Sequence, residues 1–165
     1  MDRLWSPWRL AYVTAAHTSP TECIFCNAAA DPGAELVLLR GQHGFVILNL
    51  YPYNNGHLMV APNRHIKTLT SLTAEERAEL MTLARWSEMA LTEAYHPQGI
   101  NVGINLGKAA GAGIEDHLHM HLVPRWAGDT NFMTAVADTR VLPESLQDTA
   151  ARLRSVFTRL AQANA

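Results

Sequence analysis

The 165-residue chain has few cysteines, no excess of basic charge and no long apolar run. Its 2 cysteines are too few to cross-link a secreted domain of this size, which favours a reducing cytoplasm. With 13 basic and 15 acidic residues, the net charge of −2 argues against binding to nucleic acid or to a membrane surface. No stretch approaches the roughly 18 apolar residues of a membrane span, and Pro7 interrupts the N-terminus before a signal peptide could form. The sequence therefore predicts a cytoplasmic protein with neither nucleic-acid nor membrane partners.

Two features are plentiful: hydrophobic residues, at 48% of the chain, and histidines, of which there are 8. The apolar fraction is enough to fill a core, so we expect one domain over 1–165, with an N-terminal arm over 1–22 and a C-terminal helical tail over 143–162. Imidazole binds metals, attacks phosphorus and transfers protons near neutral pH, so the distribution of the histidines is informative.

Hydrophobic periodicity predicts an α+β fold with a five-stranded, mainly antiparallel sheet. A helix is expected over 73–96, because Thr73 and Glu76 form a capping-box pattern and Pro97 and Gly99 follow. This helix should pack on the sheet. The strands are expected at 35–40, 44–50, 57–61, 99–105 and 117–123, and Pro124 should end the last of them.

The last strand reads His117-Leu-His119-Met-His121-Leu-Val123. Alternate residues of a strand share a face, so the three imidazoles should line one side about 6–7 Å apart, with leucine and methionine facing the core. A His-rich solvated face is one interpretation of this pattern, a metal clamp is a second, and a catalytic row is a third.

The same residues resemble the signature of the histidine triad (HIT) superfamily. Further similarity lies in Asn49 with His57 eight residues later, in the run 58–62 that follows, and in Asn105-x-Gly107 before the triad. The Leu-Trp-Ser-Pro-Trp-Arg motif at 4–9 and the motif at 128–133 resemble a bacterial branch of diadenosine tetraphosphate hydrolases and phosphorylases. The resemblance implies a homodimer with adenine nucleotides as substrates.

The resemblance also implies roles for individual residues. His119 would be the nucleophile that attacks an α-phosphate, and His121 and His57 would complete the catalytic group. His119 and His121 would also contact the nucleotide. The further nucleotide-binding residues would be Asn49 at the ribose, Leu50 with Phe45 and Ile47 at the base, and Asn105, Gly111, Ala112 and Gly113 at the phosphate. Many relatives carry Gly-Gln-Ser or Gly-Gln-Thr in this last loop, and here Gly111-Ala-Gly-Ile stands instead.

Cys23 and Cys26 form a Cys-x-x-Cys motif, which by itself indicates a redox pair, half a zinc site or two small buried residues. The surrounding sequence is not thioredoxin-like, which disfavours the redox interpretation. In several bacterial histidine triad proteins such a pair binds zinc with two histidines. The matching positions here are His65 and His117, and the zinc would be structural.

The sequence thus favours a histidine triad nucleotide hydrolase or phosphorylase, a nucleotidyltransferase that works through a histidine–nucleotide intermediate. Two alternatives stay open. One is a zinc-containing nucleotide sensor or interaction protein with little catalysis, which the unusual 111–113 loop favours. The other is a phosphoramidate or sugar-nucleotide transferase, although such sugar-nucleotide relatives carry a His-Pro-His core and this chain has Met120.

Overall fold

The computed structural model describes residues 23–129 and 144–163. The arm predicted over 1–22, with its motif at 4–9, lies outside these residues, as do positions 130–133 of the second motif. Among the described helices, none is long and apolar enough to cross a membrane.

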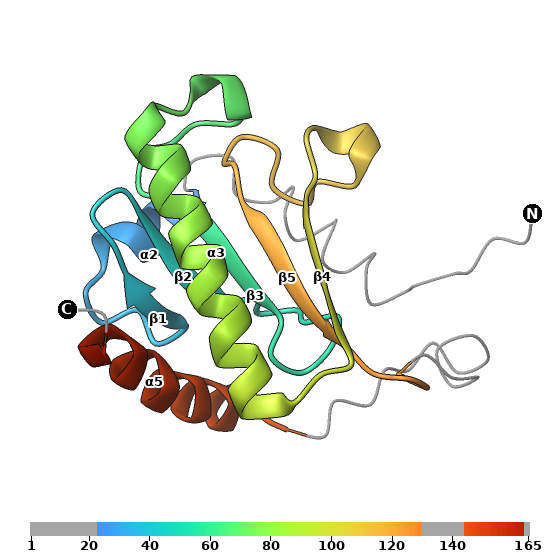
Figure 1. The fold of residues 1–165 in the computed structure, drawn as a ribbon. Helices are drawn as coiled ribbons and strands as arrows, with labels where there is room; N and C mark the ends of the chain where they lie inside the picture. The colour runs from blue at the N-terminus through green and yellow to red at the C-terminus, as the bar shows by residue number, and fades with distance from the viewer. Residues whose placement is uncertain (1–22, 130–143, 164–165) are drawn as a thin grey trace, which may run out of the picture.

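Within the described residues, five antiparallel strands form one sheet in the order β1-β2-β3-β5-β4 (Figure 1). This confirms the predicted α+β class and the five-stranded sheet. Four strands lie within two residues of the predicted ranges, and β5 departs further. The bounds are Val37–Arg40 (β1), Gly44–Leu48 (β2), Leu58–Pro62 (β3), Gly99–Ile104 (β4) and Met120–Arg125 (β5).

Strand β5 begins at Met120 and not at His117, and it continues through Pro124, which was wrongly predicted to end it. His117 and Leu118 precede the ladder, where the Leu118 amide donates to the carbonyl of Ile66 in the chain beyond β3. Proline is tolerated because β3 pairs with β5 only as far as Leu122, so the missing N–H of Pro124 interrupts no ladder on that side.

Helix α3 (Ala74–Tyr95) lies along the sheet, close to its predicted range (Figure 1). Its N-terminus carries the predicted capping box, in which Thr73 Oγ1 accepts from the Glu76 amide at 3.2 Å and Glu76 Oε2 accepts from the Thr73 amide at 2.8 Å. The helix ends at His96, whose left-handed φ of 45° turns the chain before Pro97.

The two faces of the sheet are covered differently. Helices α3 and α5 (Leu146–Ala163) pack on one face, over an apolar cluster that includes Val46, Leu58 and Leu122. Helix α2 (Ile24–Ala30), which the periodicity did not predict, covers part of the other face through Phe25. Residues 23–129 and 144–163 also contain two 3-10 turns, η1 (Leu69–Ser71) and η2 (Lys108–Ala110).

The C-terminal helix confirms the predicted helical tail, although it starts at Leu146. Leu153 and Phe157 are 0% and 1% exposed, and they lie in the same cluster as the core residues of α3. Full burial of such side chains contributes about 1.5–3 kcal/mol each, so α5 is an integral part of this core.

A substitution in the capping box tests whether the Thr73 side chain stabilises the start of α3. Replacing Thr73 by Ala removes the hydroxyl acceptor for the Glu76 amide and should lower the free energy of unfolding by about 1 kcal/mol. Urea denaturation followed by circular dichroism measures the change. Thr82→Ala is the matched control, because this hydroxyl donates only to the Ala78 carbonyl within the helix and its loss should be nearly neutral. Equal effects of the two substitutions would contradict the capping role.

Candidate active site

The triad histidines lie on the sheet face opposite α3. In the register of the central strands, His121 pairs with Met59 on β3 and with Gly103 on β4. The contact of the His119 ring with Phe25, which covers this face, places His119 on the same side, while Leu122 is 1% exposed in the core beneath α3. The predicted division into a histidine face and an apolar face is therefore present, although of the three histidines only His121 lies within β5.

A hydrogen bond to a backbone carbonyl fixes which nitrogen of the His119 ring carries the proton. Its Nδ1 lies 2.8 Å from the carbonyl oxygen of His117, and a carbonyl only accepts, so Nδ1 carries the proton and donates. In the neutral ring, Nε2 then keeps its lone pair. Burial lowers the pKa of His119, whose side chain packs 4.8 Å from the Phe25 ring, so the neutral form is favoured. This is the arrangement that a nitrogen nucleophile needs.

His57 and His121 form a second oriented pair. The Tyr53 amide donates to His57 Nδ1 at 3.1 Å, and the Asn49 side-chain amide lies 3.3 Å from the same nitrogen. His57 must therefore carry its proton on Nε2, which lies 3.0 Å from His121 Nδ1. His121 Nδ1 accepts this proton, so the neutral His121 ring has its own N–H on Nε2.

The direction of the His57–His121 hydrogen bond places an N–H donor on His121 beside the available lone pair of His119. The rings of His119 and His121 are 4.8 Å apart in an edge-on arrangement. Burial, together with the neighbouring His119, lowers the pKa of His121 to about 4. At neutral pH the two rings are uncharged, with a lone pair on one Nε2 and an N–H on the other.

The predicted phosphate loop lies next to the triad strand. Ile104 pairs with Met120, and this register carries the half-buried Asn105 to the position beside His119. The Asn105 amide is 3.4 Å from the Gly111 carbonyl. The loop also closes on itself, because the Gly111 amide donates to Lys108 and the Ala112 amide donates to Gly107. Ala112 is buried and Gly113 is exposed.

The residues predicted for the nucleoside are not gathered into one pocket. Asn49 makes a turn at the end of β2, where its Oδ1 accepts from the Tyr51 amide. Phe45 and Ile47 are covered by Phe25 of α2. Leu50 is 54% exposed and lines a separate cavity of about 250 Å³ beside the start of α5.

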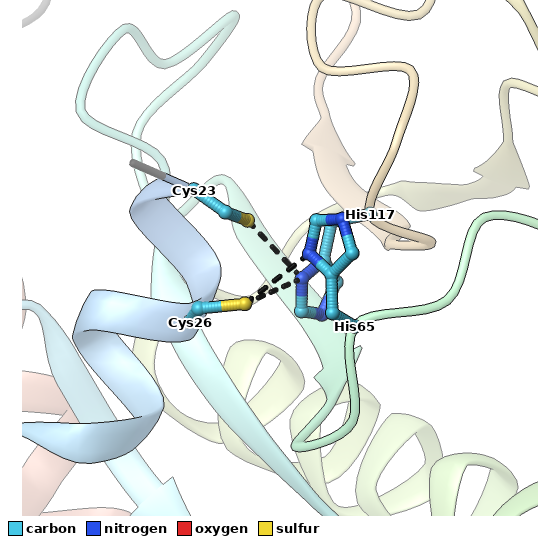
Figure 2. Close-up of side chains that lie close together, drawn as sticks. All are labelled: Cys23, Cys26, His65 and His117. Carbon is cyan, nitrogen blue, oxygen red and sulfur yellow. Dashed lines mark hydrogen bonds between the residues drawn. The ribbon is translucent and has the colours of Figure 1, made fainter. Parts of the chain in front are cut away.

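The four predicted metal ligands do come together, from α2, the loop after β3 and the chain before β5 (Figure 2). Cys23 Sγ lies 3.2 Å from His117 Nδ1, and Cys26 Sγ lies 3.2 Å from His65 Nδ1 and 3.6 Å from His117 Nδ1. All four ligand atoms are within 4.8 Å of one another. The Pro62 carbonyl accepts from His117 Nε2 at 2.9 Å, so the lone pair on Nδ1 faces the thiols.

This cluster has the donor set of a closed tetrahedral zinc site with two cysteines and two histidines. Burial, together with the adjacent Cys23, raises the pKa of Cys26, which indicates that two thiolates need a cation between them. The residues present therefore fit a zinc ion.

Two contributors to the site were not predicted from the sequence. One is the Tyr53 amide, which orients His57, and the other is Phe25, which packs against His117 and His119 at 5.1 and 4.8 Å. A backbone donor leaves no signature in side-chain identity. Phe25 lies between the two cysteines, and that position was the available signal.

The HIT domain family matches residues 34–128, which include the whole sheet. The chain belongs to the HIT domain family. This HIT protein is 39% identical to the AP-4-A phosphorylase of Mycobacterium tuberculosis over an alignment of 171 residues. The alignment covers 96% of this chain and 86% of that protein.

Two further relatives bear on the site. A Zn-bound histidine triad family protein from Mycobacterium smegmatis is 27% identical, with a TM-score of 0.69 over 86% of this chain and 97% of that one. The bis(5'-adenosyl)-triphosphatase of Dictyostelium discoideum is 36% identical over 81 residues, which is 49% of this chain and 54% of that protein. The predicted family is thereby confirmed.

The protonation of His121 can be measured by NMR of ¹⁵N-labelled histidine. We expect the Nε2–H form at pH 7 and protonation near pH 4, because burial disfavours the charged ring. An unfolded chain would take up this proton near pH 6.5, so the stability contributed by His121 is complete above 6.5 and falls as the pH falls toward 4. His121→Gln assigns the signal, and the exposed His96 is the internal comparison. Protonation of His121 near pH 6.5 would contradict the assignment.

Proposed function

We propose that this HIT protein cleaves dinucleoside polyphosphates, such as diadenosine tetraphosphate, at an α-phosphate through a covalent intermediate on His119. The observation that carries the proposal is the His119 ring itself, which is neutral, buried and held by the His117 carbonyl so that its Nε2 lone pair is available. The 39% identity to an AP-4-A phosphorylase over nearly the whole chain supports the substrate class.

In the first step, His119 Nε2 attacks the α-phosphorus, an N–P bond forms, and the bond from phosphorus to the bridging oxygen breaks. His121 Nε2–H donates a hydrogen bond to the departing oxygen, which leaves as the nucleotide anion without taking up a proton, and the bond from His57 Nε2–H to His121 Nδ1 holds the His121 ring in place. The His119 ring becomes positively charged, and its Nδ1–H stays bonded to the His117 carbonyl.

In the second step, the oxygen of an acceptor attacks phosphorus and the N–P bond breaks, which returns His119 to its neutral form. Water as acceptor gives AMP and releases one proton to the solvent. Inorganic phosphate as acceptor gives ADP. From diadenosine tetraphosphate the departing nucleotide is ATP in both cases.

The remaining predicted residues belong to the same proposal. Asn49 and Leu50 would bind the nucleoside, and Asn105 with the loop at 111–113 would bind the non-bridging phosphate oxygens. Because the Gly111 and Ala112 amides are used within the loop, phosphate contact through them requires the loop to rearrange. A loop that stayed closed would favour the alternative function, a nucleotide sensor with little catalysis.

We further propose that Cys23, Cys26, His65 and His117 bind one structural zinc. The Cys/His donor set, the ligand-atom distances and the Zn-bound relative support this assignment. When bound, the metal would join α2 to the base of the triad strand. Two free cysteines placed for a metal also suit a reducing cytoplasm.

A homodimer of single-domain subunits over 1–165 is the assembly that we propose. Strand β4 supports it, because among the described residues β4 pairs with β5 alone and its Val102 side chain is 55% exposed. An edge strand of this kind is suited to pairing with a second copy.

The function is tested by incubating the protein with diadenosine tetraphosphate, with and without inorganic phosphate, and separating the products. We expect ATP with ADP in phosphate buffer, or ATP with AMP in its absence. His119→Ala should lower kcat/KM by on the order of 10⁴-fold, because the nucleophile is lost. His43→Ala, which removes an imidazole near Glu76, is the control and should retain activity. Nucleotide binding without turnover in the unmodified protein would replace this proposal by the sensor alternative.

The zinc is tested by elemental analysis of the purified protein. We expect about one zinc per chain, and Cys26→Ser should lose it and melt at a lower temperature, because metal binding contributes to folding. Thr82→Ala, an exposed helix substitution, should keep the zinc. Full zinc occupancy in a protein lacking both cysteines would show that the ion is bound elsewhere.

A further inference from the structure

A second cleft on the active face begins at His121 and extends away from the predicted nucleoside side. It has a volume of about 360 Å³ and lies between the loop at 53–54 and strands β4 and β5. His121 lines one end and Arg125 lines the other, with Asn101 and Gly103 of β4 between them. Of the site residues predicted from the sequence, His121 and Asn105 line this cleft.

Gly103 keeps the cleft open at the reacting end. It is the register partner of His121, so a side chain at this position would stand beside the His121 ring. A Cβ placed on Gly103 would meet nothing within 4 Å. The structure therefore has free space next to the imidazole whose N–H would donate a hydrogen bond to the departing oxygen.

Arg125 is held in a fixed orientation at the far end. Its Nε and Nη2 donate to the two carboxylate oxygens of Asp129 at 2.6 and 2.8 Å, and its Nη1 donates to Asn101 Oδ1 at 3.0 Å. The Asp129 side chain is 10% exposed and also accepts from Asn54 at 2.8 Å. These contacts use three of the five guanidinium N–H groups, and one on Nη1 and one on Nη2 are left for a ligand.

The side chain of Arg125 is 44% exposed, so a ligand can reach these two donors. Asp129 offsets part of the positive charge, and recognition would therefore depend on the direction of the N–H groups more than on net charge. A planar fork that is already oriented suits the bidentate binding of a phosphate.

The placement of the cleft fits an in-line displacement. An attacking Nε2 on His119 requires the departing oxygen on the opposite side of phosphorus, next to the Nε2–H of His121. Asn49 lies at the end of β2 and Asn101 on β4, so three strand spacings, or about 14 Å, separate the nucleoside side from the cleft. A dinucleotide would cross the sheet at right angles to the strands.

We propose that this cleft binds the departing half of the substrate, with Arg125 holding a phosphate of its polyphosphate chain and Gly103 providing the space for the chain beside His121. This inference rests on the proposed function and assigns the second half of the same substrate. Asp129 and Asn101 act as positioning residues for the Arg125 fork.

The test compares two substrates that share the AMP half. Diadenosine tetraphosphate has a departing polyphosphate, whereas adenosine 5′-phosphoramidate loses only ammonia. Arg125→Gln and Gly103→Val should each lower kcat/KM for the tetraphosphate at least about 10-fold, and for the phosphoramidate by no more than about twofold. Arg159→Gln removes an exposed arginine paired with Glu93 and is the control for loss of one charge. Thermal melting of each variant reports any effect on folding.

Equal losses on both substrates, or no loss on either, would overturn the cleft assignment while leaving the proposed function in place. If the unmodified protein cleaved neither substrate, the proposed function would fail, and a binding measurement would then test the cleft assignment. Inorganic tripolyphosphate is titrated calorimetrically in the presence of AMP. Arg125→Gln should raise its Kd at least about 10-fold and Arg159→Gln should not. An unchanged Kd in Arg125→Gln would overturn the inference on its own.

Discussion

Strand β5 lies between β3 and β4 and has α3 against one of its faces, and this position determines where each of its side chains goes. Leu122 is fixed in the core, so a shift of one residue in register would bury the histidines under α3 and expose leucine. Pairing on both sides also restricts the backbone. The spacing of His121 and Arg125 along one face is a consequence of how firmly this strand is held, and His119 directly precedes the strand.

Backbone groups set the chemistry of the site as much as side chains do. The carbonyl oxygens of His117 and Pro62 can only accept a hydrogen bond, and the amide of Tyr53 can only donate one. Each therefore fixes which nitrogen of a histidine carries the proton. The site needs no carboxylate beside His119 or His121, and neutral rings in a buried setting keep complementary roles near pH 7.

Much of this arrangement could be predicted from the sequence because it depends on local patterns. Alternation identified the histidine face, and a capping box identified the start of α3. His65 and His117 were added to the Cys-x-x-Cys motif through the resemblance to histidine triad proteins. Helix α2 was missed because it has seven residues and no side-chain cap at Cys23. The Arg125–Asp129–Asn54 network was missed because it joins a loop to a strand 70 residues away, which no local pattern encodes. The Asn49 and Leu50 assignments came from the family resemblance and stay predictions. At this strand end the two consecutive side chains face different surroundings.

His117 belongs to two structures at once. Its ring faces the thiols of Cys23 and Cys26, and its carbonyl oxygen receives the Nδ1–H of His119. The two sites are thus mechanically coupled through a single residue, with no hinge between them. A displacement of α2 large enough to move the ring would also tilt the peptide plane that holds the His119 ring. Mutations around the Cys/His cluster are therefore constrained by the orientation of His119 as well as by folding.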